Sequence, residues 1–349
     1  MLRAVARIDA EAIARNCARL KAVARTGLCV VVKADGYGHG ALTAARSAQR
    51  GGADWLAVAT ANEAAGLRDG GVEGRILVMG ALSEEELPVA LDARADVVVW
   101  RRAFLDRLPD ETQVHVKLDT GMGRLGTRDV EEALDVAREA HRRGLLAGAM
   151  THFATSDDDP DFAREQLAAF RPFLHALPDG VIAHAANSAA TLAIPESRLD
   201  MVRCGVAAYG LDPFQNDPAD HGLTPAMTLA SYVAEVKPIA PGQSAGYGRR
   251  YVADAPTTLA TLPIGYADGV RRALTNNAEV LIGGRRRRLV GTVSMDNVTV
   301  EGEVERGEEA ILIGAQGDER ILAEEWASRL GTINYEITCA ISARVPRSA

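Results

Sequence analysis

The hydrophobic pattern along the first 210 residues is one of alternation between short apolar runs and longer amphipathic stretches. The runs are rich in Val, Ile and Leu, and they predict strands at residues 28–32, 55–59, 75–79, 97–100, 114–118, 148–153, 181–185 and 201–206. Between them, residues 130–141 and 162–177 carry apolar side chains at helical spacing. Eight strands with intervening helices in about 200 residues predict a (β/α)8 barrel of the TIM type.

The amino-acid composition and the hydrophobic pattern change after Leu211. Residues 212–222 are rich in Asp, Pro, Asn and Gly, which marks a loop between domains. Beyond it, short strands are predicted at 230–238, 257–263, 279–282, 288–294, 298–300 and 310–313, whereas helical stretches nearly vanish. We therefore expect an α/β barrel over residues 1–222 and a second, mostly β domain over 223–349. The arginine run 285–288 follows Gly283-Gly284 and is expected at the solvated end of a hairpin.

Composition and charge limit the possible partners and compartments. With 39 Lys and Arg against 47 Asp and Glu, the 349-residue chain has a formal charge of −8 and is expected to bind neither nucleic acid nor an anionic membrane. No apolar segment approaches the roughly 18 residues of a membrane span. The cysteines at 17, 29, 204 and 339 are too scattered for a zinc motif, so we expect reduced thiols, no metal and a cytoplasmic location.

Unusual polar residues follow several of the predicted barrel strands, where the chemistry of such barrels takes place. Lys33 ends the first strand, Lys117 the fifth and His152 the sixth, while the seventh leads to His184, Asn187 and Ser188. The eighth strand carries Arg203 and Gly205. This rim can supply what pyridoxal 5'-phosphate requires: a lysine amine, a partner for the ring nitrogen, and hydroxyl or N–H donors for the phosphate.

A competing pattern is the G-x-G-x-x-G of residues 121–126, which follows a strand and precedes a helix as in dinucleotide-binding folds. Such a fold places an acidic residue about 20 positions later, at the end of the next strand. That strand ends in Thr151-His152-Phe153-Ala154 instead. The sequence therefore argues against a nicotinamide dehydrogenase.

Nine ordered motifs give the whole chain a resemblance to the alanine racemase family. They are VKADGYGHG (32–40), DTGMGRLG (119–126), THFA (151–154), HAANS (184–188), RCG (203–205), GYGR (246–249), PIGYADG (263–269), SMD (294–296) and NYE (334–336). The resemblance spans both domains. It implies interconversion of L-alanine and D-alanine by a homodimer with shared active sites, which supplies D-alanine for peptidoglycan synthesis.

The same resemblance implies roles for individual residues. Lys33 would hold the cofactor and act as one base, and Tyr247 of the other subunit would be the second base, supported by His152. Arg203 would face the ring nitrogen, with the phosphate held near Asn187 by Tyr37, Ser188, Gly205, Val206 and Tyr335. Arg124 and the other subunit's Met295 would contact the substrate carboxylate, and Tyr266 and Asp296 would support the site. Lys117 matches a lysine that is often carbamylated in the family.

Two alternatives remain beside this interpretation. A racemase of serine or of a broader set of amino acids would share the fold, because a few side chains set the pocket. A pyridoxal phosphate carrier on the same barrel would need Lys33 but no second base, and the β domain that carries Tyr247 argues against it.

Overall fold

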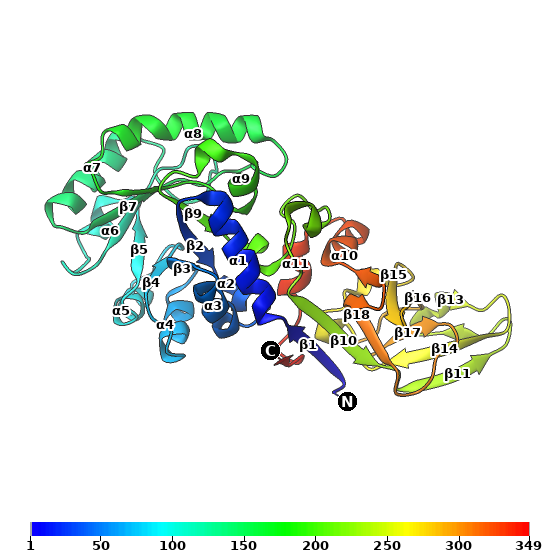
Figure 1. Ribbon diagram of the computed structural model, residues 1–349. Coiled ribbons are helices and arrows are strands. Elements are labelled where there is room, and N and C mark those ends of the chain that lie inside the picture. The colour runs from blue at the N-terminus through cyan, green and yellow to red at the C-terminus, as the bar shows by residue number, and fades with distance from the viewer. Residues whose placement is uncertain (1, 349) are drawn as a thin grey trace.

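The computed structural model describes residues 2–348 and contains the expected parallel barrel sheet (Figure 1). Its strands run in the order β8-β7-β6-β5-β4-β3-β2-β9, and every pair is parallel. The strands are β2 (Gly27–Val31), β3 (Trp55–Val58), β4 (Arg75–Val78), β5 (Asp96–Val99), β6 (Val114–Lys117), β7 (Leu146–Met150), β8 (Ile182–His184) and β9 (Met201–Cys204). Each overlaps one of the eight predicted strands, so the barrel prediction is confirmed.

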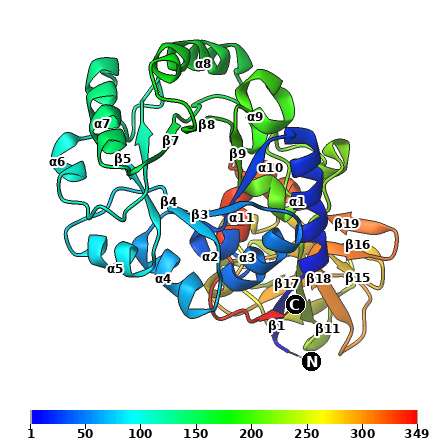
Figure 2. The same cartoon turned by 60° about the vertical axis from the view of Figure 1, so that its left-hand side comes forward.

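Helices surround this sheet and bury its outer face (Figure 2). Strands β3, β5, β6 and β9 are buried along their whole length, which explains why they are mostly apolar and why the few polar residues in them, such as His115 and Arg203, face the interior. The helical segments of this domain are α1 (Ala10–Ala24), α2 (Lys33–Tyr37), α3 (Ala41–Arg50), α4 (Ala61–Asp69), α5 (Glu86–Asp92), α6 (Arg102–Leu105), α7 (Val130–Arg142), α8 (Pro160–His175) and α9 (Ser188–Ala193).

Backbone hydrogen bonds next to β8 and β9 nearly close the barrel. The N–H of Arg203 donates to the carbonyl of Ala186 at 2.9 Å, and the N–H of Asp200 donates to that of Ala183 at 3.0 Å. The carboxyl ends of all eight strands therefore form one rim, as the interpretation of the polar residues required.

The second domain is built on a largely antiparallel sheet in the order β11-β14-β17-β16-β15-β18-β10-β1-β20. Its strands are β10 (Met227–Tyr232), β11 (Glu235–Ile239), β12 (Ser244–Ala245), β13 (Tyr251–Val252), β14 (Thr257–Leu262), β15 (Ala278–Ile282), β16 (Arg285–Val290), β17 (Val298–Glu301), β18 (Glu309–Gln316), β19 (Glu319–Ile321) and β20 (Arg347–Ser348). Strand β1 (Ala4–Ile8), which the sequence analysis did not predict, pairs with β10 and so belongs to this sheet although it precedes the barrel.

Two helices near the C-terminus, α10 (Ala323–Leu330) and α11 (Asn334–Cys339), were also not anticipated. The expectation that the second domain has almost no helices was wrong here. The turn residues Gly331 and Thr332 divide the helical pattern of this segment into two short pieces. Single 3₁₀ turns complete the structure: η1 (Pro195–Ser197), η2 (Val206–Tyr209), η3 (Pro218–His221), η4 (Tyr247–Arg249), η5 (Tyr266–Asp268) and η6 (Arg272–Leu274).

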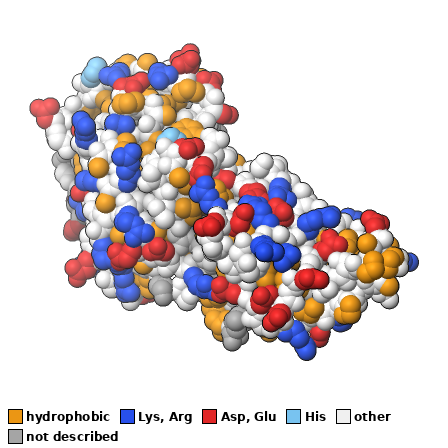
Figure 3. Space-filling view, turned by 45° about the vertical axis from the view of Figure 1, so that its right-hand side comes forward, with side chains coloured by type: hydrophobic (Ala, Val, Ile, Leu, Met, Phe, Trp, Pro, Cys, Tyr) orange, Lys and Arg blue, Asp and Glu red, His pale blue; other side chains and the backbone are white. Residues whose placement is uncertain are grey.

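The surface carries interspersed charges rather than one basic field, as one face shows in Figure 3. The arginine run forms strand β16 of the β15–β16 hairpin. Within it, Arg286 pairs with Glu279, Glu319 and Glu325, so its charge is already compensated. Between residues 2 and 348, no helix combines the length and the apolar character needed to cross a membrane.

Candidate active site

A cavity of about 280 Å³ opens among the loops that follow the barrel strands. It brings together ten of the residues singled out in the sequence: Lys33, Tyr37, Arg124, His152, Asn187, Ser188, Arg203, Gly205, Val206 and Tyr335. These residues are up to 302 positions apart in the chain, from Lys33 to Tyr335, and they come from both domains. The barrel rim and the helix α11 therefore build one site.

Lys33 enters this cavity from an unusual backbone conformation. The next four residues, 34–37, all have left-handed φ angles, of 51°, 53°, 62° and 53°, although only one of them is glycine. The turn is held by Glu63, whose Oε1 accepts the Ala34 N–H at 2.7 Å, and by Asp35, whose Oδ1 accepts the Ala41 N–H at 2.8 Å. Left-handed residues with a side chain are strained, so their cluster directly after Lys33 indicates a functional constraint.

The electrostatic surroundings of Lys33 favour a neutral amine. Burial lowers the pKa of its ammonium group, and the nearby positive charge of Arg124 lowers it further. A lysine must lose a proton before it can act as a nucleophile or base. Lys33 is therefore suited to either role.

Arg203 is fixed by acceptors on several sides. Its Nη1 donates to the carbonyl and to Nδ1 of His184, both at 2.9 Å, and its Nη2 donates to the carbonyl of Thr151 at 2.8 Å. The same Nη2 lies 3.1 Å from Nδ1 of His152. Burial lowers the pKa of the guanidinium to about 10, which leaves it charged at neutral pH. Burial and this charge hold the pKa of both histidines well below the usual range, so they are neutral.

Small and hydroxylic groups line the part of the cavity near η2. Ser188 Oγ accepts the Gly205 N–H at 3.0 Å, and an added Cβ at Gly205 would lie only 2.3 Å from Tyr37 Oη. Tyr37 stacks on Tyr209, with their ring centroids 5.1 Å apart, and burial raises the pKa of Tyr37 so that its hydroxyl keeps its proton. Because residue 205 has no Cβ, the Tyr37 hydroxyl lies close to the Ser188 hydroxyl and the backbone of Gly205, and the two hydroxyl groups can donate to an anion in this part of the cavity.

The G-x-G-x-x-G loop is closed by its own aspartate. Asp119 Oδ1 accepts the N–H groups of Gly121 and Gly123, both at 3.1 Å, and Asp119 Oδ2 accepts from Arg128. These hydrogen bonds keep the pKa of Asp119 below its ordinary value against the opposing effect of burial. A carboxylate thus occupies the position where a dinucleotide phosphate would bind, which supports the rejection of the dehydrogenase interpretation.

Lys117 lies buried at the end of β6. Burial, with the charges of Arg203 and Arg124, lowers the pKa of its ammonium group to about 8. Arg124 itself is exposed, lines the cavity and makes no ion pair with any residue from 2 to 348. It is available to an anionic ligand.

The remaining residues from the sequence analysis lie on the β domain, outside the cavity of their own chain. Tyr247, Met295 and Tyr266 expose 75%, 51% and 42% of their surface. Their loops are tied together, because Thr292 Oγ1 donates to the Tyr247 carbonyl at 2.6 Å and the Tyr266 N–H donates to the Ser294 carbonyl at 3.0 Å. Asp296 pairs with Arg344 at 2.8 Å. These loops present a joint surface of exposed aromatic and thioether side chains.

Sequence reasoning missed several cavity residues, of which Cys339 is the most informative. It lies one helical turn after Tyr335 on α11, and both line the cavity. Had α11 been predicted, this spacing of four would have pointed to Cys339. The structure also adds Val31, Ala34 and Met79 to the lining.

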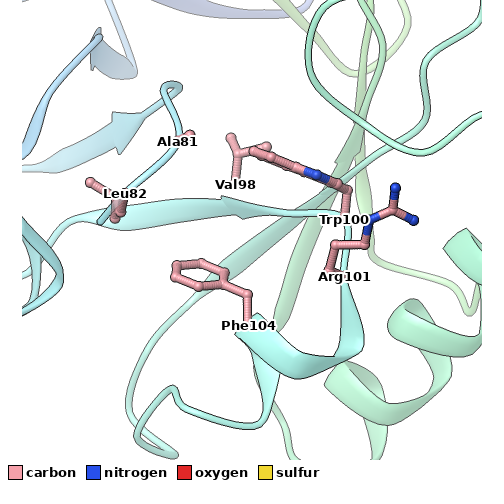
Figure 4. A pocket seen from close by; sticks show the side chains of 6 residues that line it. All are labelled: Ala81, Leu82, Val98, Trp100, Arg101 and Phe104. Atoms are coloured by element: carbon pink, nitrogen blue, oxygen red, sulfur yellow. The ribbon is translucent and has the colours of Figure 1, made fainter. Parts of the chain in front are cut away.

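A second cavity, of about 150 Å³, lies between the loop after β4, strand β5 and α6 (Figure 4). Ala81, Leu82, Val98, Trp100, Arg101 and Phe104 line it. Its only charged side chain is Arg101, which is paired with Glu132. This cavity offers no base or nucleophile, so it is the weaker candidate for an active site.

Comparison with known proteins agrees with this geometry. The family described as alanine racemase, N-terminal domain, matches residues 8–213, and that described as alanine racemase, C-terminal domain, matches residues 226–349. The chain is 40% identical to the alanine racemase of Thermobifida fusca, covering 99% of this chain and 97% of the relative. For the alanine racemase of Geobacillus stearothermophilus these values are 39%, 98% and 92%.

Two solved structures are similar over the whole chain. The alanine racemase of Streptomyces lavendulae has a TM-score of 0.94 and 37% identity, covering 100% of this chain and 97% of that one. The alanine racemase of E. faecalis has a TM-score of 0.93 and 36% identity, with coverage of 99% and 97%. The likeness extends to both domains.

Proposed function

The chain belongs to the alanine racemase family, and from this premise we propose which of its residues carry out the reaction and with which cofactor. It is an amino-acid racemase, an isomerase that interconverts L-alanine and D-alanine and supplies D-alanine for peptidoglycan. The observation that carries the assignment of residues is the single cavity in which Lys33, Arg203 and the anion site near Gly205 meet.

Pyridoxal 5'-phosphate fits the groups that this cavity offers. Lys33 would hold it covalently, Arg203 would donate to its ring nitrogen, and His152 and Asn187 would flank it. Its phosphate would be held by Tyr37, Ser188, Gly205, Val206 and Tyr335, since these provide hydroxyl and N–H donors on one wall of the cavity and the missing Cβ at residue 205 lets the Tyr37 hydroxyl take its place there. The chemistry that the cofactor supplies is acidification of the α-hydrogen of a bound amino acid.

Two bases on opposite faces of the substrate would move the α-proton. Lys33 is one, because its pKa is lowered in the cavity. Tyr247 is proposed as the other, supplied by a second copy of the chain, which is supported by its exposure and its place on the β domain. Removal of the α-proton by one base and delivery of another proton by the second base on the opposite face inverts the configuration.

Further residues bind the substrate and support the site. The free guanidinium of Arg124 and the partner's Met295 would contact the substrate carboxylate, and Tyr266 and Asp296 would hold the loops around Tyr247. Lys117 is proposed to be carbamylated, since an amine with a pKa near 8 is partly neutral at pH 7 and can add carbon dioxide with loss of a proton. The four cysteines are free thiols, which supports a cytoplasmic location.

The shared site can be tested by mixing two inactive variants. Lys33→Ala and Tyr247→Phe homodimers should each be nearly inactive, since both of their sites lack one base. After random subunit exchange half of the dimers are mixed, and each mixed dimer has one site with both bases, so activity should recover to about a quarter of wild type. Failure to recover after demonstrated exchange would place Tyr247 in the site of its own chain.

A racemisation assay on a panel of amino acids defines the substrate. Loss of optical activity is followed for a panel that includes L-alanine, L-serine and larger amino acids, with added cofactor. Alanine should be turned over fastest. A higher kcat/KM for serine would favour the alternative racemase, and no racemisation of any member would overturn the function.

A further inference from the structure

Four buried polar side chains form a continuous chain across the barrel interior. Asp96 Oδ2 lies 3.3 Å from His115 Nε2, His115 Nδ1 lies 2.7 Å from His184 Nε2, and His184 Nδ1 lies 2.9 Å from Arg203 Nη1. Each is at most 4% exposed. Asp96 is the first residue of β5 and Arg203 the third residue of β9, so the chain runs from the amino-terminal rim to the cavity.

The direction of these hydrogen bonds follows from the chemistry of Arg203, which can only donate. His184 must therefore accept at Nδ1, and a neutral imidazole that accepts at one nitrogen carries its proton on the other. That proton on Nε2 of His184 is donated to Nδ1 of His115, whose own proton then lies on Nε2. Only an acceptor can complete the chain at that point, and Asp96 supplies it.

Two surrounding features show that the fold makes room for this chain of hydrogen-bonded side chains and holds it in place. A Cβ at Gly148 would lie 2.2 Å from His115 Nδ1, so glycine at this position leaves the space in which the two imidazoles meet. Arg75 pairs with Asp96 and stacks over Trp55 at 4.4 Å, and the edge of Trp55 in turn meets His115 with ring centroids 5.2 Å apart. Arg75 thus holds the carboxylate in line with His115.

We propose that Asp96 is a positioning residue that sets the polarity of this chain through His115 and His184, so that a lone pair always faces Arg203. The proposal rests on the proposed function, in which Arg203 donates to the ring nitrogen of the cofactor. Both terminal nitrogens of Arg203 are committed to protein acceptors, whereas within residues 2–348 its Nε–H has no such acceptor. If the hydrogen bonds ran in the opposite direction, an N–H of His184 would point at Nη1 of Arg203, and the two donors would turn the guanidinium away.

Without Asp96 the chain loses its terminal acceptor. His115 must then leave a buried N–H unpaired or take the other tautomer, which sets two donors against each other along the chain. Asparagine at this position would still present a carbonyl oxygen to His115. Asp96→Asn should therefore preserve the polarity, and Asp96→Ala should destroy it.

The test is nitrogen NMR of histidine-labelled protein, first without cofactor and then loaded. In wild type the proton of His115 and that of His184 are both expected on Nε2, and the same is expected for Asp96→Asn. In Asp96→Ala at least one imidazole should change tautomer, and racemisation by the loaded enzyme should slow about tenfold, the factor for one lost hydrogen bond between Arg203 and the ring nitrogen. Asp92→Ala, which removes an exposed carboxylate at the end of α5, is the matched control and should change neither.

A proton on Nδ1 of either wild-type imidazole overturns the proposal, even if Asp96→Ala does not fold. So does an Asp96→Ala protein with both tautomers unchanged. Because the tautomers are measured without cofactor or substrate, this outcome is separate from a failure of the proposed function, which would appear as absent racemisation in the wild-type enzyme.

Discussion

Gly205 provides the sharpest test of the proposed phosphate site, because its missing side chain has a measurable consequence. In Gly205→Ala the new methyl carbon would lie 2.3 Å from Tyr37 Oη and 2.9 Å from Tyr37 Cζ. An ordinary contact needs about 3.4 Å or more, so the hydroxyl must move by about 1 Å. The φ of Gly205 is −107°, so its sign does not penalise alanine.

The Gly205→Ala substitution should lower both the stability of the fold and the affinity for the cofactor. Tyr37 is buried and stacked on Tyr209, so overpacking should lower the free energy of unfolding by about 1–3 kcal/mol. Displacement of the Tyr37 hydroxyl removes one or two donors from the phosphate, and at about 1.4 kcal/mol each this weakens cofactor affinity about 10- to 100-fold. The change should appear as a higher Kd in an absorbance titration of cofactor-free protein, with unfolding followed separately in urea.

Two further variants separate these effects. Gly205→Ala combined with Tyr37→Phe removes the nearer of the two atoms that meet the methyl group and leaves the contact with Cζ, so stability should partly recover while affinity stays low. Gly66→Ala, in α4 with no atom within 4 Å of the added methyl, should leave affinity unchanged and stabilise the protein by about 0.5–1 kcal/mol. If Gly205→Ala bound the cofactor within twofold of wild type, the phosphate would lie elsewhere.

Two titratable residues give predictions about stability and pH. The pKa of Lys117 falls from 10.5 to about 8 in the folded protein, so its buried charge opposes folding below pH 8, and this penalty disappears between about pH 8 and 10.5. With carbon dioxide excluded, Lys117→Met should therefore raise the free energy of unfolding at pH 7 by about 2–3 kcal/mol. Denaturant titrations should show this gain shrinking above pH 8. An equal gain at pH 7 and pH 10.5 would contradict the assignment. Burial raises the pKa of the Glu324 carboxyl, so the folded state keeps its proton to a higher pH than the unfolded chain does. The free energy of unfolding should therefore fall as the pH rises above about 4.5, and Glu324→Gln should flatten this decline and be the more stable protein at pH 7. A steeper decline in Glu324→Gln would show that the charged form is the one that the fold prefers.

The barrel and most of its rim could be predicted because they depend on local signals. Parallel strands that are buried on both faces are apolar runs in the sequence, and the rule that chemistry gathers at their carboxyl ends identifies Lys33 and Arg203 without any knowledge of contacts. Strand β1 lacks such a signal. Its alternating pattern is short, and its partner β10 lies more than 200 residues away in the chain.

Two parts of the site depend on tertiary contacts that override local preference. The left-handed φ values of Ala34, Asp35 and Tyr37 contradict what these residue types favour. They persist because Glu63 holds the start of the turn from another helix and Asp35 ties the turn to the first residue of α3. The link from Asp96 to His115 joins residues near the amino-terminal ends of the neighbouring parallel strands β5 and β6, and only the register of the two strands brings them together. Sequence periodicity assigns a face to a residue but not its hydrogen-bond partner.

The charge of the cavity is opposite to that of the chain, and this contrast explains how one small site can hold two anions. Lys33, Arg124 and Arg203 line it, and Lys117 lies buried near the two arginines, within a molecule of formal charge −8. The carboxylates nearby are already hydrogen-bonded, Asp119 to two backbone N–H groups and Arg128, and Glu63 to the N–H groups of Ala34 and Ala59, and Glu63 only partly opposes the lowering of the Lys33 pKa. Burial lowers the pKa of Lys33 and the charge of Arg124 lowers it further, and a phosphate near Gly205 or a carboxylate near Arg124 would offset the second effect. Ligand binding and the protonation state of the proposed base are thereby coupled, because each anion that enters the cavity favours the charged form of the lysine.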